Sequence, residues 1–526
     1  MTALTSLARI EAASLGQAQL IRTVRHVHIS DRPLVFIPLG LAGEPCAPLA
    51  ALVGDDRLEP QLLVVTSPLN RDERFAFAAD LAGIVLGYIG SYLAGPEPPD
   101  NEPYPDAPQL IVPNAGGVAF ARLLGRSTRF RPVEGAGAVP ASVPVLGRWL
   151  TYLAERSHPS ASLILTATGA LAAHWATGQS AVEDENLATL LAWIAPPPGR
   201  SGADAALAAE DPTRCPPAGP ATDPGFDRDV LTGRLTAIRD TRLAADLAGQ
   251  RRAVAALRDD LREVLMPTWR LVWQAIDLLR TLPEAGHVAD RRKGDRLSFS
   301  GYARYLAEGG FPQPRKDAAV DAARRLGRLE AEQQRLETQM AYDDPLVMAE
   351  YRMTGAAFEG VVVRAEPARL DESGKESGKK AKLRPWIWVE TPDEVTAAPG
   401  TELRSPARPS QKAVVIDVRS PGEDQDGRTL VTLELRSGMG RGLTPAAGSV
   451  PEADDVVCYT TLTLDFQPSP EFPGREDTPW THGGPPPEYV PAELDRAEPW
   501  DGEDWADDAY ARAVVDGALV AGPDEP

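Results

Sequence analysis

The sequence DVLTGRLTAIRDTRLAADLAGQRRAVAALRDDLREVLMP, residues 229–267, decides how the chain is organised. Its apolar residues recur at spacings of three, four or seven, which is the pattern of one face of an amphipathic helix. The pattern continues through residues 268–279, and we expect Pro267 to kink or interrupt the helix because proline removes a backbone donor. Another helical segment, residues 317–342, has apolar residues at coiled-coil-like intervals. We therefore predict a long-helix, coiled-coil-like arm over residues 226–355, with two long antiparallel helices and a smaller insert.

The region before this arm, residues 1–195, has the pattern of an α/β domain. Apolar runs at residues 32–40, 61–66 and 109–112 predict buried strands, and the last two are each followed by a loop and a helical pattern. Repeated βα units imply parallel strands with helices packed on the sheet. Residues 162–175 are ambiguous. A helix is favoured there because no proline interrupts the segment, and a strand followed by a turn is the alternative.

After the arm the period of the apolar residues changes to two, and β-branched and aromatic residues predominate. This predicts five strands, at residues 360–364, 385–390, 412–419, 428–436 and 455–466. Five short strands in about 110 residues fit a small barrel of the OB or SH3-like kind. The expected fold class is multidomain α+β. Its parts are an α/β domain (1–195), a Pro/Gly-rich linker (196–225), the helical arm (226–355), the barrel (356–466) and an acidic, largely disordered tail (467–526).

The net charge of −21 is unevenly distributed. Residues 449–526 contain 19 acidic residues against three arginines, so most of the negative charge lies at the end of the chain. Residues 286–340 reverse this balance, with 11 Arg and Lys against eight Asp and Glu. The chain therefore combines a mildly basic helical middle with an acidic end.

Cysteine content and hydropathy indicate a cytoplasmic protein. Cys46, Cys215 and Cys458 are too far apart in sequence for a C-x-x-C pair, which argues against a disulfide framework or a cysteine zinc site. The first 20 residues lack a basic start followed by an apolar core, and no run of 18 apolar residues occurs, so we expect neither secretion nor a membrane span. Only seven of the 54 basic residues are lysine, a composition that resembles proteins of GC-rich bacteria.

Common catalytic signatures are missing from the sequence. There is no P-loop, no zincin motif, no nucleophile elbow and no Rossmann glycine motif, so an enzyme of these classes is disfavoured, although dispersed catalytic residues stay open. His26 and His28 would share one face of a strand, but no third ligand is identifiable. We therefore predict no metal site and no cofactor.

The sharpest anion-binding candidate is the loop between the third predicted strand and its helix. It contains Asn114, Gly116 and Gly117, whose backbone amides could approach a phosphate at the helix amino terminus. Thr66 and Ser67 follow the preceding strand and would lie at the same edge of a parallel sheet. The alternative is a tight turn that needs glycine for its backbone conformation and binds nothing.

A second candidate combines cations with aromatic residues. In the helical arm it comprises Arg291, Arg292, Lys293, Arg296, Tyr302 and Arg304. Such a surface could neutralise phosphates and stack bases. The alternatives are a solvated helix face and a docking site for the acidic tail of the same chain. In the barrel, Trp386 and Trp388 share one face of a strand while Ile387 and Val389 share the other, so one pair should be core and the other available for binding.

These features favour a non-enzymatic accessory or scaffold protein of a bacterial cytoplasmic assembly, one that handles nucleic acid. We expect it to bind other proteins through the helical arm and the acidic tail, to bind nucleic acid through the basic and aromatic residues, and not to bind membranes. A homodimer formed by the arm is also compatible with the sequence. The alternative function is an α/β domain that binds or hydrolyses a nucleotide or another phosphate compound and that the arm and barrel regulate.

Overall fold

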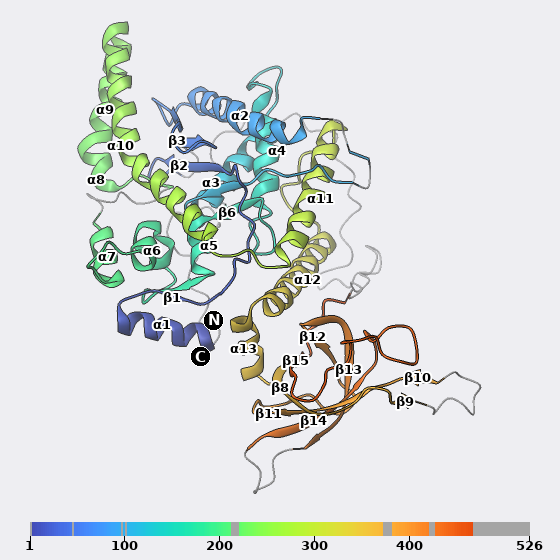
Figure 1. Cartoon of the computed structure of the whole chain (residues 1–526). Coiled ribbons are helices and arrows are strands. Elements are labelled where there is room, and N and C mark those ends of the chain that lie inside the picture. Colours follow the sequence, from blue (N-terminus) through green and yellow to red (C-terminus); the bar gives the residue numbers. More distant parts are fainter. Residues whose placement is uncertain are drawn as a thin grey trace, which may run out of the picture.

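The computed structural model describes residues 3–44, 47–95, 98–99, 102–211, 220–371, 381–419 and 427–465. These residues form a mixed α/β body followed by a closed barrel of six antiparallel strands (Figure 1). Helices α12 (Ala319–Asp343) and α13 (Pro345–Met353) lead from the body to the barrel. The predicted acidic tail, residues 467–526, lies outside the described residues.

A five-stranded mixed sheet lies at the centre of the body. Its strands, in spatial order, are β4 (Gln61–Val64), β3 (Pro48–Gly54), β2 (Leu34–Gly40), β5 (Leu110–Val112) and β6 (Ile164–Thr166). β2, β5 and β6 run parallel, as expected of βα units, whereas β3 is antiparallel to both of its neighbours. The three predicted strands, β2, β4 and β5, run in the same direction as expected, and β3, which was not predicted, makes the sheet mixed. The few residues between β2 and β3 allow only an antiparallel pairing, because a parallel crossover needs a dozen or more.

Residues 162–175 do not form the single helix that the sequence favoured. They form β6, the short helix α5 (Ala167–Ala172) and the start of β7 (Trp175–Ala176), so the strand-and-turn alternative describes them better. The change of conformation falls at Thr166, whose side chain accepts a hydrogen bond from the Gly169 amide and caps α5. Leu163, Ala167, Leu171 and His174 are buried in this arrangement.

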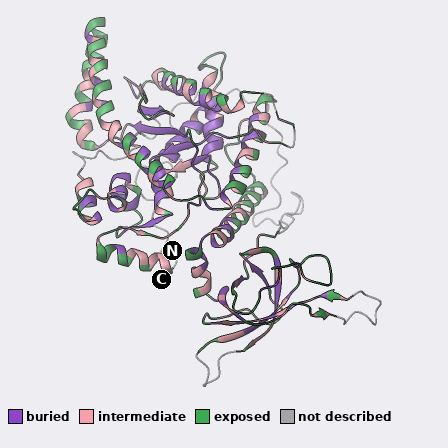
Figure 2. Cartoon of the chain, in the orientation of Figure 1, coloured by how far each residue is buried: buried purple, intermediate pink, exposed green. Residues whose placement is uncertain are grey.

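Helices cover both faces of the sheet because side chains alternate along β2. Leu34 and Phe36 face one hydrophobic core, and Val35 and Ile37 face the other. The first core is completed by α2 (Arg71–Leu93), α3 (Ala115–Thr128), α4 (Ser142–Ala154) and α11 (Val288–Ala307). The second is completed by α5, α6 (Leu187–Ile194) and α10 (Leu247–Arg280). Figure 2 shows the buried residues concentrated in the sheet and on the helix sides that face it.

The stretch from which the sequence analysis started is a helical hairpin rather than one continuous helix. α9 (Thr232–Leu243) and α10 lie against each other, with Ile238 and Leu257 buried between them and Arg234 paired with Asp260 at 2.6 Å. The chain reverses at Ala245, whose φ of 54° is left-handed. α10 continues through Pro267, so proline does not end the helix. The hairpin projects from the body in Figure 1, and the second half of α10 packs on the sheet.

The predicted coiled-coil stripe on α12 is only partly covered. Leu336 is buried, but Leu326 is 58% exposed. The remaining short elements of the body are α1 (Ala3–Leu15), β1 (Gln19–Leu20), which pairs with β7, α7 (Gly202–Ala209), α8 (Pro224–Phe226) and a helical turn at Asp227–Leu231. Much of the arm expected at residues 226–355 belongs to the α/β body, because α10 and α11 contribute side chains to its two hydrophobic cores.

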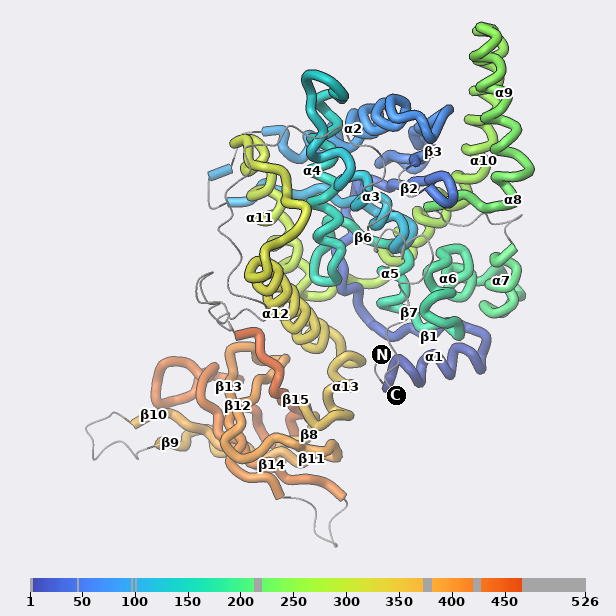
Figure 3. The backbone as a smooth tube through the Cα atoms, turned by 180° about the vertical axis from the view of Figure 1, so that it is seen from behind, coloured from blue at the N-terminus to red at the C-terminus, as the bar shows by residue number. Residues whose placement is uncertain are grey.

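The barrel contains the five predicted strand regions and one that the sequence analysis missed. Its closed order is β11 (Trp386–Thr391), β14 (Thr429–Leu435), β13 (Arg408–Arg419), β12 (Glu402–Ser405), β15 (Val456–Thr460) and β8 (Ala357–Glu366). β12 was missed because ELRS is short and polar. A small ladder of β9 (Leu370–Asp371) and β10 (Lys382–Leu383) lies beside it. Figure 3, which shows the molecule from behind, shows α12 and α13 leading to the barrel.

Among the described residues, α2 is the one helix long and apolar enough to cross a membrane by length and composition. Its residues Phe77, Leu81, Val85 and Ile89 are buried in the first core. Core helices of soluble proteins also have this composition, so the match gives weak support for a membrane span.

Candidate functional site

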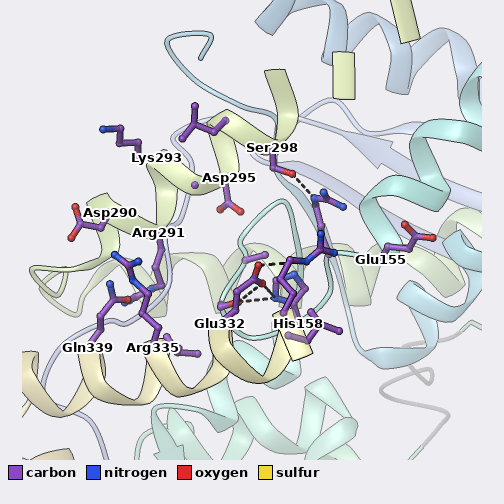
Figure 4. A pocket seen from close by; sticks show the side chains of 18 of the residues that line it. Glu155, His158, Asp290, Arg291, Lys293, Asp295, Ser298, Glu332, Arg335 and Gln339 are labelled. Atoms are coloured by element: carbon purple, nitrogen blue, oxygen red, sulfur yellow. Dashed lines mark hydrogen bonds and ion pairs between the residues drawn. The ribbon is translucent and has the colours of Figure 1, made fainter. Parts of the chain in front are cut away.

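A cavity beside the predicted basic cluster lies between α11, α12 and the segment that follows α4. Its volume is about 420 Å³, and side chains from the two helices face each other across it (Figure 4). The charged side chains that line it are Arg156, Arg291, Lys293, Arg325, Arg328 and Arg335, with Glu155, Asp290, Asp295 and Glu332. Cations therefore outnumber carboxylates by two. We call this space the α11–α12 cavity.

Burial shifts the pKa values of two groups that line the α11–α12 cavity, Asp295 and His158. Asp295 is 6% exposed, and burial raises the pKa of its carboxyl, although the Ser162 amide at 2.9 Å, the Ser162 hydroxyl and Arg292 work in the opposite direction. Burial also lowers the pKa of His158, so this ring stays neutral at neutral pH. The charge offered to a ligand is therefore set by the six basic side chains against the carboxylates that line the cavity.

Three of these cations are fixed by contacts within the protein. Arg156 Nε donates to Ser298 Oγ at 2.7 Å, and its guanidinium lies 4.0 Å from the centre of the Tyr152 ring. Arg291 donates to Gln339 Oε1 and to the carbonyl of His26, both at 2.7 Å. Arg325 pairs with Asp317 at 3.1 Å. These contacts hold the walls of the cavity in place.

Lys293 and Arg335 are free to bind a ligand. Both line the cavity and are exposed, and within the described part of the chain neither makes a hydrogen bond or an ion pair. Arg328 is nearly as free, since its contact with Glu332 is long, at 3.9 Å. These three cations, Lys293 on α11 and Arg328 and Arg335 on α12, lack strong partners and provide a site for an anion.

A second recess of about 340 Å³ adjoins the α11–α12 cavity and shares Glu155, Arg156, Ser298, Arg325 and Arg328 with it. The aromatic residues of this recess are stacked along α11. The rings of Tyr152 and Tyr302 lie 4.0 Å apart and nearly parallel, and the Tyr305 ring follows at 6.2 Å. Tyr152 is buried, whereas Tyr305 is 43% exposed. Only the outer ring of the stack is therefore accessible to a ligand.

Two further exposed aromatic residues, Phe311 and Phe130, do not line this recess but contact Tyr305 and Arg315 beside it. Phe311 is 80% exposed, and its carbonyl accepts a hydrogen bond from the Tyr305 hydroxyl at 2.8 Å. Phe130 is 41% exposed and lies 5.6 Å below the guanidinium of Arg315. Gln313 joins these segments by donating to the Tyr302 hydroxyl at 2.8 Å. The two recesses thus form a groove that is basic at one end and both basic and aromatic at the other.

The predicted residues of α11 are divided between two sides of the helix. Arg291 and Lys293 line the α11–α12 cavity, and Tyr302 lines the second recess. Arg292, Arg296 and Arg304 instead bind backbone carbonyls of the segment 98–107, and Arg292 also binds the Asp106 carboxylate. Residues four apart lie on one side of a helix, which explains why Arg292 and Arg296 leave the groove together. The structure brings together half of the predicted cluster.

The sequence analysis did not select Arg156, Arg325, Arg328 or Arg335. A signal was present in the sequence, because at 100° per residue Arg325, Arg328 and Arg335 of α12 fall within about 80° of one another on the helix. Their side of α12 was overlooked because the apolar stripe suggested a coiled coil. Arg156 follows the end of α4, and its position near α12 depends on the tertiary fold.

The predicted tryptophan pair lies on the outside of the barrel. Ile387 and Val389 are buried in the barrel core, so Trp386 and Trp388 are the pair left at the surface. Each ring is covered by an arginine, with Arg369 at 4.0 Å from Trp386 and Arg364 at 4.5 Å from Trp388. The tryptophans are therefore partly occupied by intramolecular cation–π contacts.

The loop at the start of α3 is closed by a carboxylate of the same chain. Glu185 Oε2 accepts hydrogen bonds from the Ala115 amide at 3.2 Å and the Thr168 hydroxyl at 3.3 Å. A negative side chain thus lies where an anionic ligand was predicted. Asn114 donates to the Glu185 carbonyl at 3.3 Å.

The two glycines of this loop have a packing role. A Cβ at Gly116 would lie 2.5 Å from Pro220, and one at Gly117 would lie 2.7 Å from Val112. Thr66 accepts from Arg242 and donates to Glu73, and the Ser67 carbonyl accepts from the Asn70 amide. β3 and β2 separate the ends of β4 and β5, so the two halves of the predicted site are about three strand spacings, or roughly 14 Å, apart.

Within the described residues, no group of three or more His, Cys, Asp or Glu side chains is placed to hold a metal ion. His26 is buried and stacks on His174, with ring centres 6.3 Å apart. The chain as a whole matches no known protein family, and no curated protein or solved structure shows significant similarity to it.

Proposed function

We propose that this protein is a non-enzymatic accessory protein that binds single-stranded nucleic acid in the groove formed by the α11–α12 cavity and the second recess. The observation that carries the proposal is the meeting of weakly paired cations with exposed aromatic rings. Proteins that bind single strands without sequence preference combine a positively charged groove with aromatic side chains on which bases stack.

The phosphate contacts of the proposal fall to Lys293, Arg328 and Arg335. Residues 290–305 of α11 line the two recesses, and this span is about 22 Å long at 1.5 Å per residue. A strand laid along this length offers several phosphates to the three cations. The net charge of the whole chain is strongly negative, so binding depends on the local field of the groove.

The stacking contacts fall to Tyr305 and Phe311. Stacking of a base on an aromatic side chain contributes about 1–3 kcal/mol and tolerates any base. These rings are attached to the rigid core through Tyr302 and Gln313, which reduces the entropy lost on binding. We expect sequence-tolerant binding that prefers single strands.

We propose that the protein also acts as a scaffold in a bacterial cytoplasmic assembly. Its support is the separation of functions along the chain, with the groove on the body and the tryptophan–arginine surface on the barrel. The barrel surface would bind a partner protein or a further length of the strand. A homodimer through the α9–α10 hairpin stays a prediction, and light scattering tests it.

Replacing Lys293 and Arg335 together with alanine should weaken the binding of a fluorescently labelled single strand of about 20 nucleotides by roughly tenfold or more at low salt. Two lost phosphate contacts should also reduce the slope of log K against log salt by about 1.4, since each contact to a single strand contributes about 0.7. Fluorescence anisotropy over a salt series measures both quantities.

The matched control is the replacement of Arg251 and Arg252 with alanine, because both are exposed on the projecting hairpin and the change of charge is identical. This control should leave the slope unchanged. Equal weakening by the two double variants would refute the groove as the binding site, and lack of binding by the native chain at low salt would refute the function.

The alternative, a nucleotide-binding α/β domain, is less well supported because Glu185 lies at the start of α3. A thermal-shift series with nucleotides tests it. Stabilisation by a nucleotide that persists in the Lys293 and Arg335 double variant would favour this alternative.

A further inference from the structure

We propose that the acidic segment 499–508 of this chain, PWDGEDWADD, docks in the α11–α12 cavity and competes there with nucleic acid. The competition rests on the function proposed above, whereas the docking does not. The cavity would then be covered by its own chain until a strand displaces the segment. Three observations support this segment as the occupant of the cavity. The described chain ends near α12, the tail is long enough to reach the cavity, and the basic and apolar side chains of the cavity complement the segment.

The described chain ends beside the helix that lines the cavity. The hydroxyl of Tyr342, in the last turn of α12, donates to the carbonyl of Leu462 at 2.9 Å. Three residues later, Asp465 is bound by Lys412 at 2.7 Å and by Arg404. The final 61 residues therefore start from a fixed point near the carboxyl end of α12.

The distance from this point to the cavity is short compared with the length of the tail. Arg335 and Arg325 precede Tyr342 by seven and 17 residues, which is about 10 and 26 Å along the helix axis. About eight extended residues cover the longer distance at roughly 3.3 Å per residue. Segment 499–508 begins 37 residues after Leu462 and can reach the whole cavity. A tether of this kind gives an effective concentration on the order of millimolar.

The chemistry of segment 499–508 complements the cavity. The segment carries five carboxylates and two tryptophans within ten residues, and no cation. The cavity offers Lys293, Arg328 and Arg335 for the carboxylates. Leu297, which is 45% exposed, and Leu329 provide apolar surface for Trp500 and Trp505. The same tryptophans can also stack on arginine guanidinium groups.

Docking is tested directly by zero-length carbodiimide cross-linking of the full chain. The reagent joins a lysine amine to a carboxylate only where the two are in contact. The expected product is an amide between Lys293 and one of the acidic residues of segment 499–508. It should form at low salt, disappear at about 0.5 M salt because screening weakens the contact, and be absent from Lys293→Arg, which keeps the charge.

Competition is tested in the full chain by neutralising the segment with Asp501→Asn, Glu503→Gln, Asp504→Asn, Asp507→Asn and Asp508→Asn. The neutralised protein should bind the labelled strand about tenfold more tightly than the native chain, since the tethered competitor is removed. Glu471→Gln with Glu476→Gln, in the same tail but outside the segment, is the control and should change the affinity less than twofold.

The outcomes separate docking from the proposed function. A Lys293 cross-link together with tighter binding after neutralisation supports both. A cross-link in a protein that binds no strand in either form supports docking and overturns nucleic acid as the competitor. Equal binding by the native and neutralised proteins without a cross-link overturns the docking and leaves the nucleic-acid function standing.

Discussion

Replacing Trp269 with alanine should lower the free energy of unfolding of the α/β body by about 3–5 kcal/mol, the usual cost of truncating a large core side chain. Trp269 is 1% exposed and is the largest fully buried side chain among the described residues. It anchors α10 on the sheet, where its indole donates to the Arg57 carbonyl at 3.0 Å and its ring meets that of Trp273 edge-on. The truncation removes the packing and leaves the Arg57 carbonyl without this donor.

The measurement is urea unfolding followed by circular dichroism at 222 nm, with the transition of the body compared between variants. Leu243→Ala is the control, because Leu243 is 80% exposed at the tip of the same hairpin and should cost less than about 0.5 kcal/mol. A similar small effect for Trp269→Ala would show that the second half of α10 does not pack on the sheet. The predicted arm would then be a separate domain after all.

Replacing Asp344 with alanine should cost about 3–5 kcal/mol, because it breaks a buried charged network at the start of α13. Asp344 is fully buried and lies 3.6 Å from the His26 ring nitrogen. Its carboxylate accepts from the Thr23 amide at 2.7 Å, from the Thr23 hydroxyl at 3.0 Å and from the Leu346 amide at 2.9 Å. The first residues of the body thus hold the joint between α12 and α13. The control is Asp321→Ala on the exposed side of α12, where the pair with Arg324 contributes little.

The same network predicts a loss of stability in acid. Burial by itself would raise the pKa of Asp344, but the neighbouring His26 ring and the donors of Leu346 and Thr23 outweigh it and lower the pKa to about 2. A carboxyl whose pKa is depressed in the folded state stabilises the fold above its unfolded pKa of about 3.9. The contribution, about 2.5 kcal/mol, is therefore present above pH 4 and lost as the pH falls towards 2. Asp344→Ala should lose this part of the acid dependence, and an unchanged acid profile would contradict the assignment.

The barrel was predictable because most of its strands have an alternation of apolar residues that is visible in the local sequence. Trp386–Thr391 alternates buried and half-buried residues, as a strand with one face in a core must, and its pattern alone places Ile387 and Val389 inside. β12 and β3 lacked that signal. β12 has only four residues and β3 is PLAALVG, rich in alanine and leucine, so their conformation depends on the neighbouring strands that pair with them.

The groove was harder to predict because it is assembled from parts far apart in the sequence. Local sequence marked Lys293 and Tyr302 as members of a basic and aromatic cluster, but it could not show that Arg292 and Arg296 turn towards the segment 98–107. Nor could it bring Arg156 beside α12. The hairpin turn at Ala245 was missed for a related reason, since the helical period continues across the turn while the chain reverses.

Photo-cross-linking of the full chain to a single strand that contains iodouracil tests the central claim most directly, because this base reacts with aromatic side chains that it contacts. Our account predicts adducts on Tyr305 or Phe311, beside the second recess, and their loss in Lys293→Ala with Arg335→Ala. Adducts confined to Trp386 and Trp388 would contradict it, since they would place the strand on the barrel and leave the groove without a role in binding.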